Sequence, residues 1–229
     1  MDRPEGMAGT GDLMEKSVII DRFPSKKNQV FHIRGEHYDW VKKVFADPLG
    51  FQTEKMTGDL LADTSLTVPG RLFLDEDRLT IGYEYINGYP VVNIIEKADS
   101  KKATEVMEKI CSWLVEFYDI CRKKTGQQYI WGDIHLRNLL YEEKTGMVYG
   151  VDFEECRPGR METDAARIYV FVLHYDPAFT ERKKQLARFL RETLSASLRL
   201  DEEFLEQEIL RETEELLARR SHGTKEKRI

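Results

Sequence analysis

The stretch IWGDIHLRNLL, residues 130–140, and the quartet VDFE, residues 151–154, decide how the rest of the chain is interpreted. Asp133 and Asn138 stand five residues apart in the first segment, and Asp152 stands in the second. The residues between 139 and 151 have the pattern of an apolar hairpin, which can bring the two segments together. Carboxylate and amide oxygens are the ligands that hard divalent cations prefer. The pattern favours one shared oxygen-lined site over three unrelated loop residues.

The chain on either side of these segments divides into a β-rich part and a helical part. Before about residue 88 there are short runs of β-branched and aromatic residues, and the pair Asp47-Pro48 predicts the start of one helix. After Gly88 the apolar residues recur at steps of three and four, which is the helical period. The first such helix is expected to begin at a Ser100 cap. The four helical patterns cover residues 100–124, 164–175, 179–198 and 201–220.

We therefore expect an α+β fold of two lobes. The first lobe would be a small antiparallel sheet with one helix, and the second would be helical and carry the segment around Asp133. The expected division is a flexible tail at 1–15, the sheet lobe at 16–86, the helical lobe at 87–220 and a second flexible tail at 221–229.

The residue types around Asp133 are those that phosphoryl transfer requires. That reaction needs an acid to orient the attacking hydroxyl, and an amide oxygen and a second carboxylate to hold Mg²⁺ against the phosphates. The segments Gly132–Asn138 and Asp152–Glu154 resemble the catalytic loop and metal-binding triplet of the protein-kinase-like superfamily. The closest resemblance is to its small-molecule branch, which includes aminoglycoside phosphotransferases, choline kinases and lipopolysaccharide sugar kinases. By this resemblance Asp133 is catalytic, and Asn138 and Asp152 bind the metal.

The resemblance extends to the β-rich part. The strand at 39–45 is similar to the one that carries the phosphate-binding lysine, and strand alternation places Lys43, not Lys42, on the face shared with Val41. Glu54 is then similar to the helix carboxylate that pairs with this lysine. The segment from Ser25 to Asn28 stands where the family has its phosphate-covering loop, although it lacks the usual glycines.

Residues 79–88 resemble the hinge between the two lobes. There the backbone of Glu84 and Ile86 would bind adenine, and Tyr83 would stand at the back of the pocket. Asp164 resembles the buried aspartate that braces the catalytic loop. The implied activity is ATP- and Mg²⁺-dependent transfer of a γ-phosphate to a hydroxyl of a small molecule such as a sugar, an aminoglycoside or an amino alcohol.

Composition narrows the class of protein. The net charge of −6 over 229 residues gives no basic surface typical of nucleic-acid binding. The three cysteines at 111, 121 and 156 are neither close enough for a zinc site nor even in number for a disulfide framework. No apolar stretch approaches the length of a membrane span and the first residues lack a signal-peptide pattern, so the cytoplasm is the expected location.

Two alternatives to a small-molecule kinase stay open at this stage. The first is an atypical protein kinase that acts on serine or threonine of a protein substrate. The second is a catalytically inactive kinase-like module for nucleotide binding or interaction, which the missing glycines near Ser25 favour and the set of Asp133, Asn138 and Asp152 opposes. The acceptor and the oligomeric state do not follow from the sequence.

Overall fold

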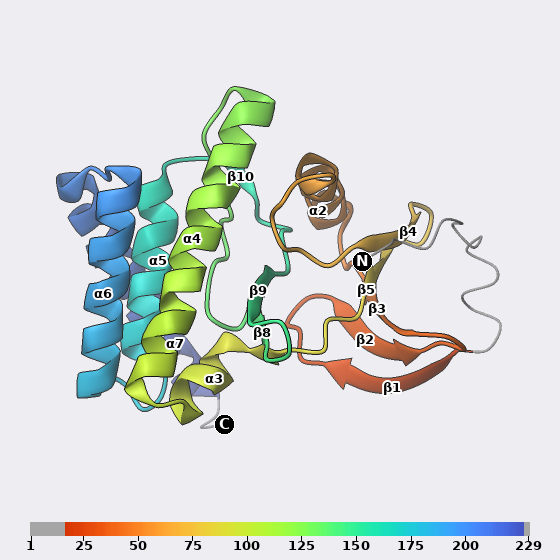
Figure 1. The fold of residues 1–229 in the computed structure, drawn as a ribbon, viewed down its shortest axis with the longest axis horizontal. Helices are drawn as coiled ribbons and strands as arrows, with labels where there is room; N and C mark the ends of the chain where they lie inside the picture. Colours follow the sequence, from red (N-terminus) through yellow and green to blue (C-terminus); the bar gives the residue numbers. More distant parts are fainter. Residues whose placement is uncertain (1–16, 227–229) are drawn as a thin grey trace.

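The computed structural model describes residues 17–226, which form a small sheet part and a larger helical part (Figure 1). The sheet part contains five strands and the helix α2. Its elements are β1 (Val18–Phe23), β2 (Gln29–Arg34), β3 (Asp39–Val44), α2 (Pro48–Leu61), β4 (Arg71–Asp75) and β5 (Thr80–Glu84). The strands are antiparallel, in the order β1-β2-β3-β5-β4. The predicted α+β fold with a small antiparallel sheet and a helical lobe is confirmed.

Helix α2 begins where the sequence predicts it. The side chain of Asp47 accepts a hydrogen bond from the Gly50 N–H, 2.9 Å away, and Pro48 occupies the first turn. Phe51 on α2 packs against Phe45 and Ile81 of the sheet. This contact fixes the helix over the sheet and so places the helix residue Glu54 relative to strand β3.

The helical part begins after the hinge at residues 85–88. It contains five helices and five short strands. These are β6 (Tyr89–Pro90), α3 (Val91–Lys97), α4 (Ser100–Thr125), β7 (Tyr129–Ile130), β8 (Leu139–Glu142), β9 (Met147–Gly150), β10 (Arg157–Pro158), α5 (Met161–His174), α6 (Glu181–Leu198) and α7 (Glu202–Glu226). In Figure 1, α4, α5, α6 and α7 lie together at one end, and β8 and β9 lie between them and the sheet.

Three details differ from the sequence-based expectation. Asp99, and not Ser100, caps α4, because its carboxylate accepts from the Lys102 N–H. Helix α3 was not predicted; it has only seven residues and no side-chain cap. Helix α7 continues to Glu226, six residues into the stretch expected to be a flexible tail. The other expected tail, residues 1–15, and the last three residues lie outside the described part of the chain.

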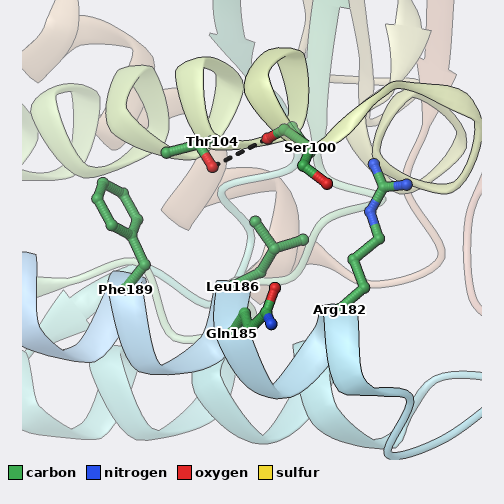
Figure 2. A pocket seen from close by; sticks show the side chains of 7 residues that line it. Ser100, Thr104, Arg182, Gln185, Leu186 and Phe189 are labelled. Carbon is green, nitrogen blue, oxygen red and sulfur yellow. Dashed lines mark hydrogen bonds between the residues drawn. The ribbon is translucent and has the colours of Figure 1, made fainter.

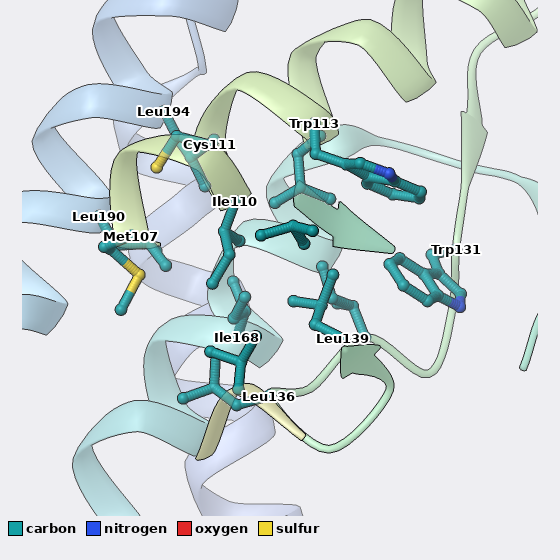
Figure 3. Packing of buried hydrophobic residues seen from close by; sticks show 14 of the residues in the cluster. Met107, Ile110, Cys111, Trp113, Trp131, Leu136, Leu139, Ile168, Leu190 and Leu194 are labelled. Carbon is teal, nitrogen blue, oxygen red and sulfur yellow. The ribbon is translucent and has the colours of Figure 1, made fainter. Parts of the chain in front are cut away.

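One large apolar core holds the helical part together and anchors the segment around Asp133 from below. Figure 3 shows α4 residues such as Ile110 packed with Leu136 and Leu139 of that segment and with Ile168 of α5. Leu190 and Leu194 of α6 complete the same cluster. The segment thus rests on three helices, which gives its polar residues a rigid base.

Candidate active site

The segment at residues 133–137 alternates between surface and core. Ile134 and Leu136 are fully buried, whereas Asp133, His135 and Arg137 face outward, and the Asp133 side chain is 48% exposed. The two apolar side chains thus lie in the core, and the polar residues beside them remain accessible. We call residues 130–138 the catalytic loop, after the role predicted for Asp133.

Asp164 of α5 braces the catalytic loop from inside. Its carboxylate accepts hydrogen bonds from the Trp131 N–H (2.7 Å), the Gly132 N–H (3.0 Å) and the Tyr118 hydroxyl (3.1 Å). Gly132 has a φ of +86°, and a Cβ there would lie 2.2 Å from the Glu155 carbonyl oxygen. Only glycine fits this position without moving the neighbouring backbone, which accounts for the residue before Asp133.

Loss of the Asp164 carboxylate should destabilise the whole protein. Asp164→Ala would leave three buried donors without a partner, and each costs about 1–3 kcal/mol. We expect the free energy of unfolding, measured by urea denaturation, to fall by about 3 kcal/mol or more. The control is Asp119→Ala on the surface of α4, whose two ion pairs are exposed, and its midpoint should not move. Equal midpoints for the two variants would contradict the bracing role.

Asn138 and Asp152 are brought together with Asp133 by backbone and side-chain hydrogen bonds. The Asn138 side-chain amide donates to the Asp133 carbonyl (3.0 Å), and the Val151 N–H donates to the Asn138 carbonyl (2.9 Å). The indole N–H of Trp131 donates to the carbonyl of Asp152 (2.7 Å). The three residues named from the sequence thus belong to one hydrogen-bonded pair of loops.

Asp152 has the left-handed backbone conformation, with a φ of +69°. This region is sparsely populated by residues other than glycine and costs free energy, so the surrounding contacts must hold it. The bond from Trp131 is one such contact. This bond joins the catalytic loop directly to the Asp152 segment.

Lys43, Glu54 and Asp152 form a buried ion cluster between the sheet and the catalytic loop. The Lys43 Nζ lies 2.6 Å from Glu54 Oε2 and 2.7 Å from Asp152 Oδ1. Glu54 also accepts from the Phe153 N–H (3.1 Å) and the Tyr83 hydroxyl (2.8 Å). In the register of β3 with β5, Lys43 is opposite Ile81 and Val41 is opposite Tyr83. Lys43 and Tyr83 therefore share one face of the sheet.

Electrostatics keep the Lys43 ammonium charged at neutral pH. Burial alone lowers the pKa of Lys43, but the carboxylates of Glu54 and Asp152 outweigh it, and the pKa of Lys43 is raised. The pKa of Glu54 is also raised, because burial disfavours its charged form more than the Lys43 ammonium favours it. The three donors directed at Glu54 are the partners of an ionised carboxylate. The cluster thus presents an oriented cation that is suited to anionic oxygens.

His135 is a neutral neighbour of Asp133. Burial lowers the pKa of His135, although the Asp133 carboxylate opposes this effect. Its Nδ1 accepts from the Asn138 N–H at 3.2 Å, and its Nε2 lies 3.8 Å from Asp133 Oδ2. A ring nitrogen that accepts must be unprotonated, which agrees with a neutral imidazole. Its partners assign His135 a part in holding the loop.

The predicted phosphate-covering loop is tied to the segment after Asp152. The Asn28 side chain donates to Glu154 Oε2 (2.6 Å) and accepts from the Ala46 N–H (3.0 Å), while the Ser25 hydroxyl accepts from the Asn28 N–H (3.1 Å). Lys27 forms an ion pair with Glu155 at 3.2 Å. Asn28, one of the residues expected to bind nucleotide, is buried in these contacts. Ser25 is exposed at the surface of the loop.

The two hinge residues expected to bind adenine lie at the end of β5. The Glu84 N–H donates to the Gly70 carbonyl (2.8 Å), and the Ile86 carbonyl accepts from the Gly88 N–H (2.8 Å). These two bonds leave the sequence-based prediction, adenine binding by the backbone of Glu84 and Ile86, untested. The structure does not join these residues directly to the Lys43 cluster, but Tyr83 stands between the hinge and Glu54.

A metal would be held by an amide and a carboxylate rather than by a carboxylate cluster. Within residues 17–226, no three histidine, cysteine, aspartate or glutamate side chains converge in a metal-binding group. The donor of the Asn138 amide is directed at the Asp133 carbonyl, so its oxygen points the other way. The Asp152 side chain is 37% exposed and gives one oxygen to Lys43. Two oxygens from two adjoining loops fit Mg²⁺, which completes its shell with water and phosphate oxygens.

A separate small cavity lies between α4 and α6 of the helical part (Figure 2). It has a volume of about 60 Å³, and its lining includes Thr104, Arg182 and Phe189. Sites for small molecules usually measure at least about 300 Å³. This cavity is a packing defect at the size of one or two waters, and it adds no candidate for a substrate site.

The arrangement defines the class of protein. A five-stranded antiparallel sheet, a helix carboxylate paired with a strand lysine and a braced loop on a helical lobe constitute the protein-kinase-like fold. A sequence model of the phosphotransferase enzyme family (APH) matches residues 112–202. This segment contains the catalytic loop and the Asp152 segment, and it ends where α7 begins.

Two solved structures are similar over most of the chain. One is assigned as an aminoglycoside phosphotransferase of Ralstonia eutropha JMP134, with 13% identity, a TM-score of 0.61, and coverage of 89% of this chain and 77% of that one. The other is the amicoumacin kinase hAmiN in complex with AMP-PNP, Ca²⁺ and Ami, with 11% identity, a TM-score of 0.62, and coverage of 87% and 82%. No curated protein matches the sequence. These likenesses confirm the kinase-like fold, and the family model matches the segment that carries the resemblance to small-molecule phosphotransferases.

The sequence placed Tyr83 at the back of the pocket, but it did not indicate three contacts of the site. The Trp131 indole donates to the Asp152 carbonyl, the Tyr83 hydroxyl donates to Glu54, and Arg167 lies beside Asp133. Arg167 follows Asp164 by three residues on α5. Since residues three apart on a helix share a face, the bracing role expected of Asp164 was a usable signal for Arg167. No comparable local signal marks the other two.

Proposed function

We propose that this chain is an ATP-dependent kinase that uses Mg²⁺ to transfer the γ-phosphoryl group to a hydroxyl of a small molecule. The observation that carries the proposal is the ion cluster of Lys43, Glu54 and Asp152 adjoining the loop of Asp133 and Asn138. The held ammonium of Lys43 and the side-chain oxygens of Asn138 and Asp152 support this proposal, because they adjoin the loop of the outward-facing Asp133 carboxylate. The similarity to phosphotransferases supports the same reaction.

In this proposal each residue acts through position and charge. Lys43, held by Glu54, would bind phosphate oxygens of ATP. The Glu84 carbonyl and the Ile86 N–H would bind the adenine, and Ser25 would border the phosphates. Asn138 and Asp152 would hold Mg²⁺, which supplies charge neutralisation between the phosphates when it is bound. Asp133 would accept a hydrogen bond from the acceptor hydroxyl and orient it for in-line attack.

The contacts of the predicted phosphate-covering loop favour a second candidate, a nucleotide-binding module without transferase activity. Asn28 and Lys27 are bonded to Glu154 and Glu155, and the loop between β1 and β2 lacks the glycines that let a backbone approach phosphates closely. In that case nucleotide would bind without turnover.

Ligand-dependent stability separates these candidates from a protein that binds no nucleotide. We expect ATP with Mg²⁺ to raise the melting temperature, with a smaller rise for ATP alone, because a ligand that binds only the folded state stabilises it. At 100 times the dissociation constant the stabilisation is about 2.7 kcal/mol. No shift with ATP, with or without Mg²⁺, would refute nucleotide binding altogether.

Turnover then decides between the kinase and the inactive module. We expect ADP release above the rate of hydrolysis by water when the correct hydroxyl acceptor is present. A panel of sugars, aminoglycosides and amino alcohols tests the small-molecule proposal, and a serine-containing protein substrate serves as the comparison. A melting shift without ADP release from any acceptor or from water would favour the module.

A further inference from the structure

Arg167 contacts the catalytic loop from helix α5. Its Nη1 donates to the Gly132 carbonyl and lies 3.7 Å from Asp133 Oδ1. The Arg167 side chain is 22% exposed. A guanidinium is charged at every relevant pH and presents several donors in a rigid plane. One side chain therefore holds both the backbone before Asp133 and the carboxylate of Asp133 itself.

Arg167 is itself held by a glutamate of helix α7. The Oε2 of Glu212 accepts from Arg167 Nε at 3.3 Å, and the Oε1 accepts from Arg219 Nη2 at 2.9 Å. The Glu212 side chain is 9% exposed. A buried carboxylate that is shared by two arginines has little freedom to move, so the Nε of Arg167 is fixed at the end opposite to the loop.

Helix α7 thus reaches Asp133 through a chain of side chains: Arg219, Glu212, Arg167 and Asp133. The helix packs along α5, and it lies almost wholly outside the segment that the phosphotransferase family model matches, which ends at residue 202. A helix that served only to cover α5 would need apolar contacts such as the one Leu205 makes in the core. The buried ion pair directed at the catalytic loop is not required for that packing.

We propose that α7 completes the active site, with Glu212 fixing Arg167 and Arg167 fixing the orientation of Asp133. Arg167 and Glu212 are positioning residues, because they act through Asp133 and not on the phosphates. The inference rests on the proposed kinase function. At 3.7 Å the guanidinium restrains the Asp133 carboxylate without a close hydrogen bond, so Asp133 keeps acceptor capacity for a hydroxyl.

The experiment compares kcat and the KM for ATP across five variants of the full chain, four single and one double. The acceptor is one that releases ADP in the panel above or, if none does, water. We expect Arg167→Met to lower kcat about 10- to 100-fold, since small misplacements of a catalytic group cost that much, with the KM for ATP within twofold. Arg167→Lys should keep more activity than Arg167→Met, because it restores the charge. Glu212→Gln should lower kcat about 3- to 10-fold.

Glu208→Gln is the matched control. Glu208 lies one turn before Glu212 on α7, its side chain is 10% exposed, and it pairs with Arg211 of the same helix. This variant should keep the kcat of the parent chain. Melting temperatures of all variants report whether a loss of activity is only a loss of folded protein.

The double variant Arg167→Met/Glu212→Gln gives the decisive comparison. If Glu212 acts through Arg167, the double variant should be no slower than Arg167→Met alone. Multiplicative losses, an unchanged kcat in Arg167→Met, or equal effects of Glu208→Gln and Glu212→Gln would overturn the inference while the kinase function stands. A parent chain with nucleotide binding and no turnover would overturn the kinase function first, and this inference with it.

Discussion

Asp133→Ala is expected to lower phosphoryl transfer by about 10³-fold or more while nucleotide binding survives. The Asp133 side chain is half exposed and has no hydrogen bond that holds the loop; the loop is held by the Asp133 carbonyl, which accepts from Asn138, and by the Asp164 brace. Truncation at Cβ should therefore remove the group that orients the acceptor and leave the loop in place. A coupled assay of ADP release measures the loss.

The same variant also tests the separation between binding and chemistry. Its melting shift with ATP and Mg²⁺ should match that of the parent chain within about a degree, because the proposed phosphate and metal contacts come from other residues. Asp77→Ala, in the exposed turn between β4 and β5, serves as a surface control with full activity. Turnover in Asp133→Ala within tenfold of the parent would remove Asp133 from the proposed mechanism.

Asp152→Ala is expected to lose both turnover and the Mg²⁺-dependent part of nucleotide binding. Asp152 gives one oxygen to Lys43 and is the only carboxylate that we assign to the metal. Its removal would take away a metal ligand and one of the two carboxylates that hold the Lys43 ammonium. The measurement is the melting temperature with a non-hydrolysable ATP analogue over a titration of MgCl₂. In the variant, the melting temperature should not change with the MgCl₂ concentration.

Asp152→Asn separates the loss of charge from a change of backbone. The left-handed conformation of residue 152 is tolerated better by asparagine than by alanine, so the Asn variant should keep the fold of the segment. It should still lose most of the Mg²⁺ response. Glu143→Ala, in the exposed turn between β8 and β9, is the carboxylate control. A Mg²⁺ response in Asp152→Asn equal to that of the control would contradict the assignment of the metal.

The two sets of variants also probe different sides of the site. In the proposed mechanism Asp133 orients the acceptor and Arg167 acts through Asp133, whereas Asp152 and Lys43 would bind the metal and the nucleotide. A loss of nucleotide binding in Arg167→Met would therefore contradict a role of Arg167 on the acceptor side of the site. The melting shift is the common measurement that sorts all variants, since it does not require the acceptor to be known.

Much of the local structure followed from residues that are neighbours in the sequence. The cap at Asp47 with Pro48 located the start of α2. The helical periods located α4, α5 and α6 to within three residues, and they located the start of α7 but not its end. The signal fails where an element is short. Helix α3 has seven residues and no side-chain cap. Its apolar residues Val91, Val92, Ile94 and Ile95 have helical spacing, but so short an apolar run does not distinguish a helix from a strand.

The sequence by itself determined the catalytic loop. The spacing of Asp133, Asn138 and Asp152 indicated this loop, and in strand β3 neighbouring side chains point to opposite faces of the sheet. The choice of Lys43 over Lys42 for the inner face of β3 follows from the same rule.

Only the tertiary structure decided which distant groups meet. Lys43 and Asp152 are 109 residues apart, and Arg167 and Glu212 are 45 apart. Such contacts depend on how the sheet docks on the helical part and how α7 lies along α5, which is set by the packing of whole apolar faces and not by any short pattern. Local sequence determines the direction of a side chain, but the packing of the apolar core determines which distant residue that side chain contacts.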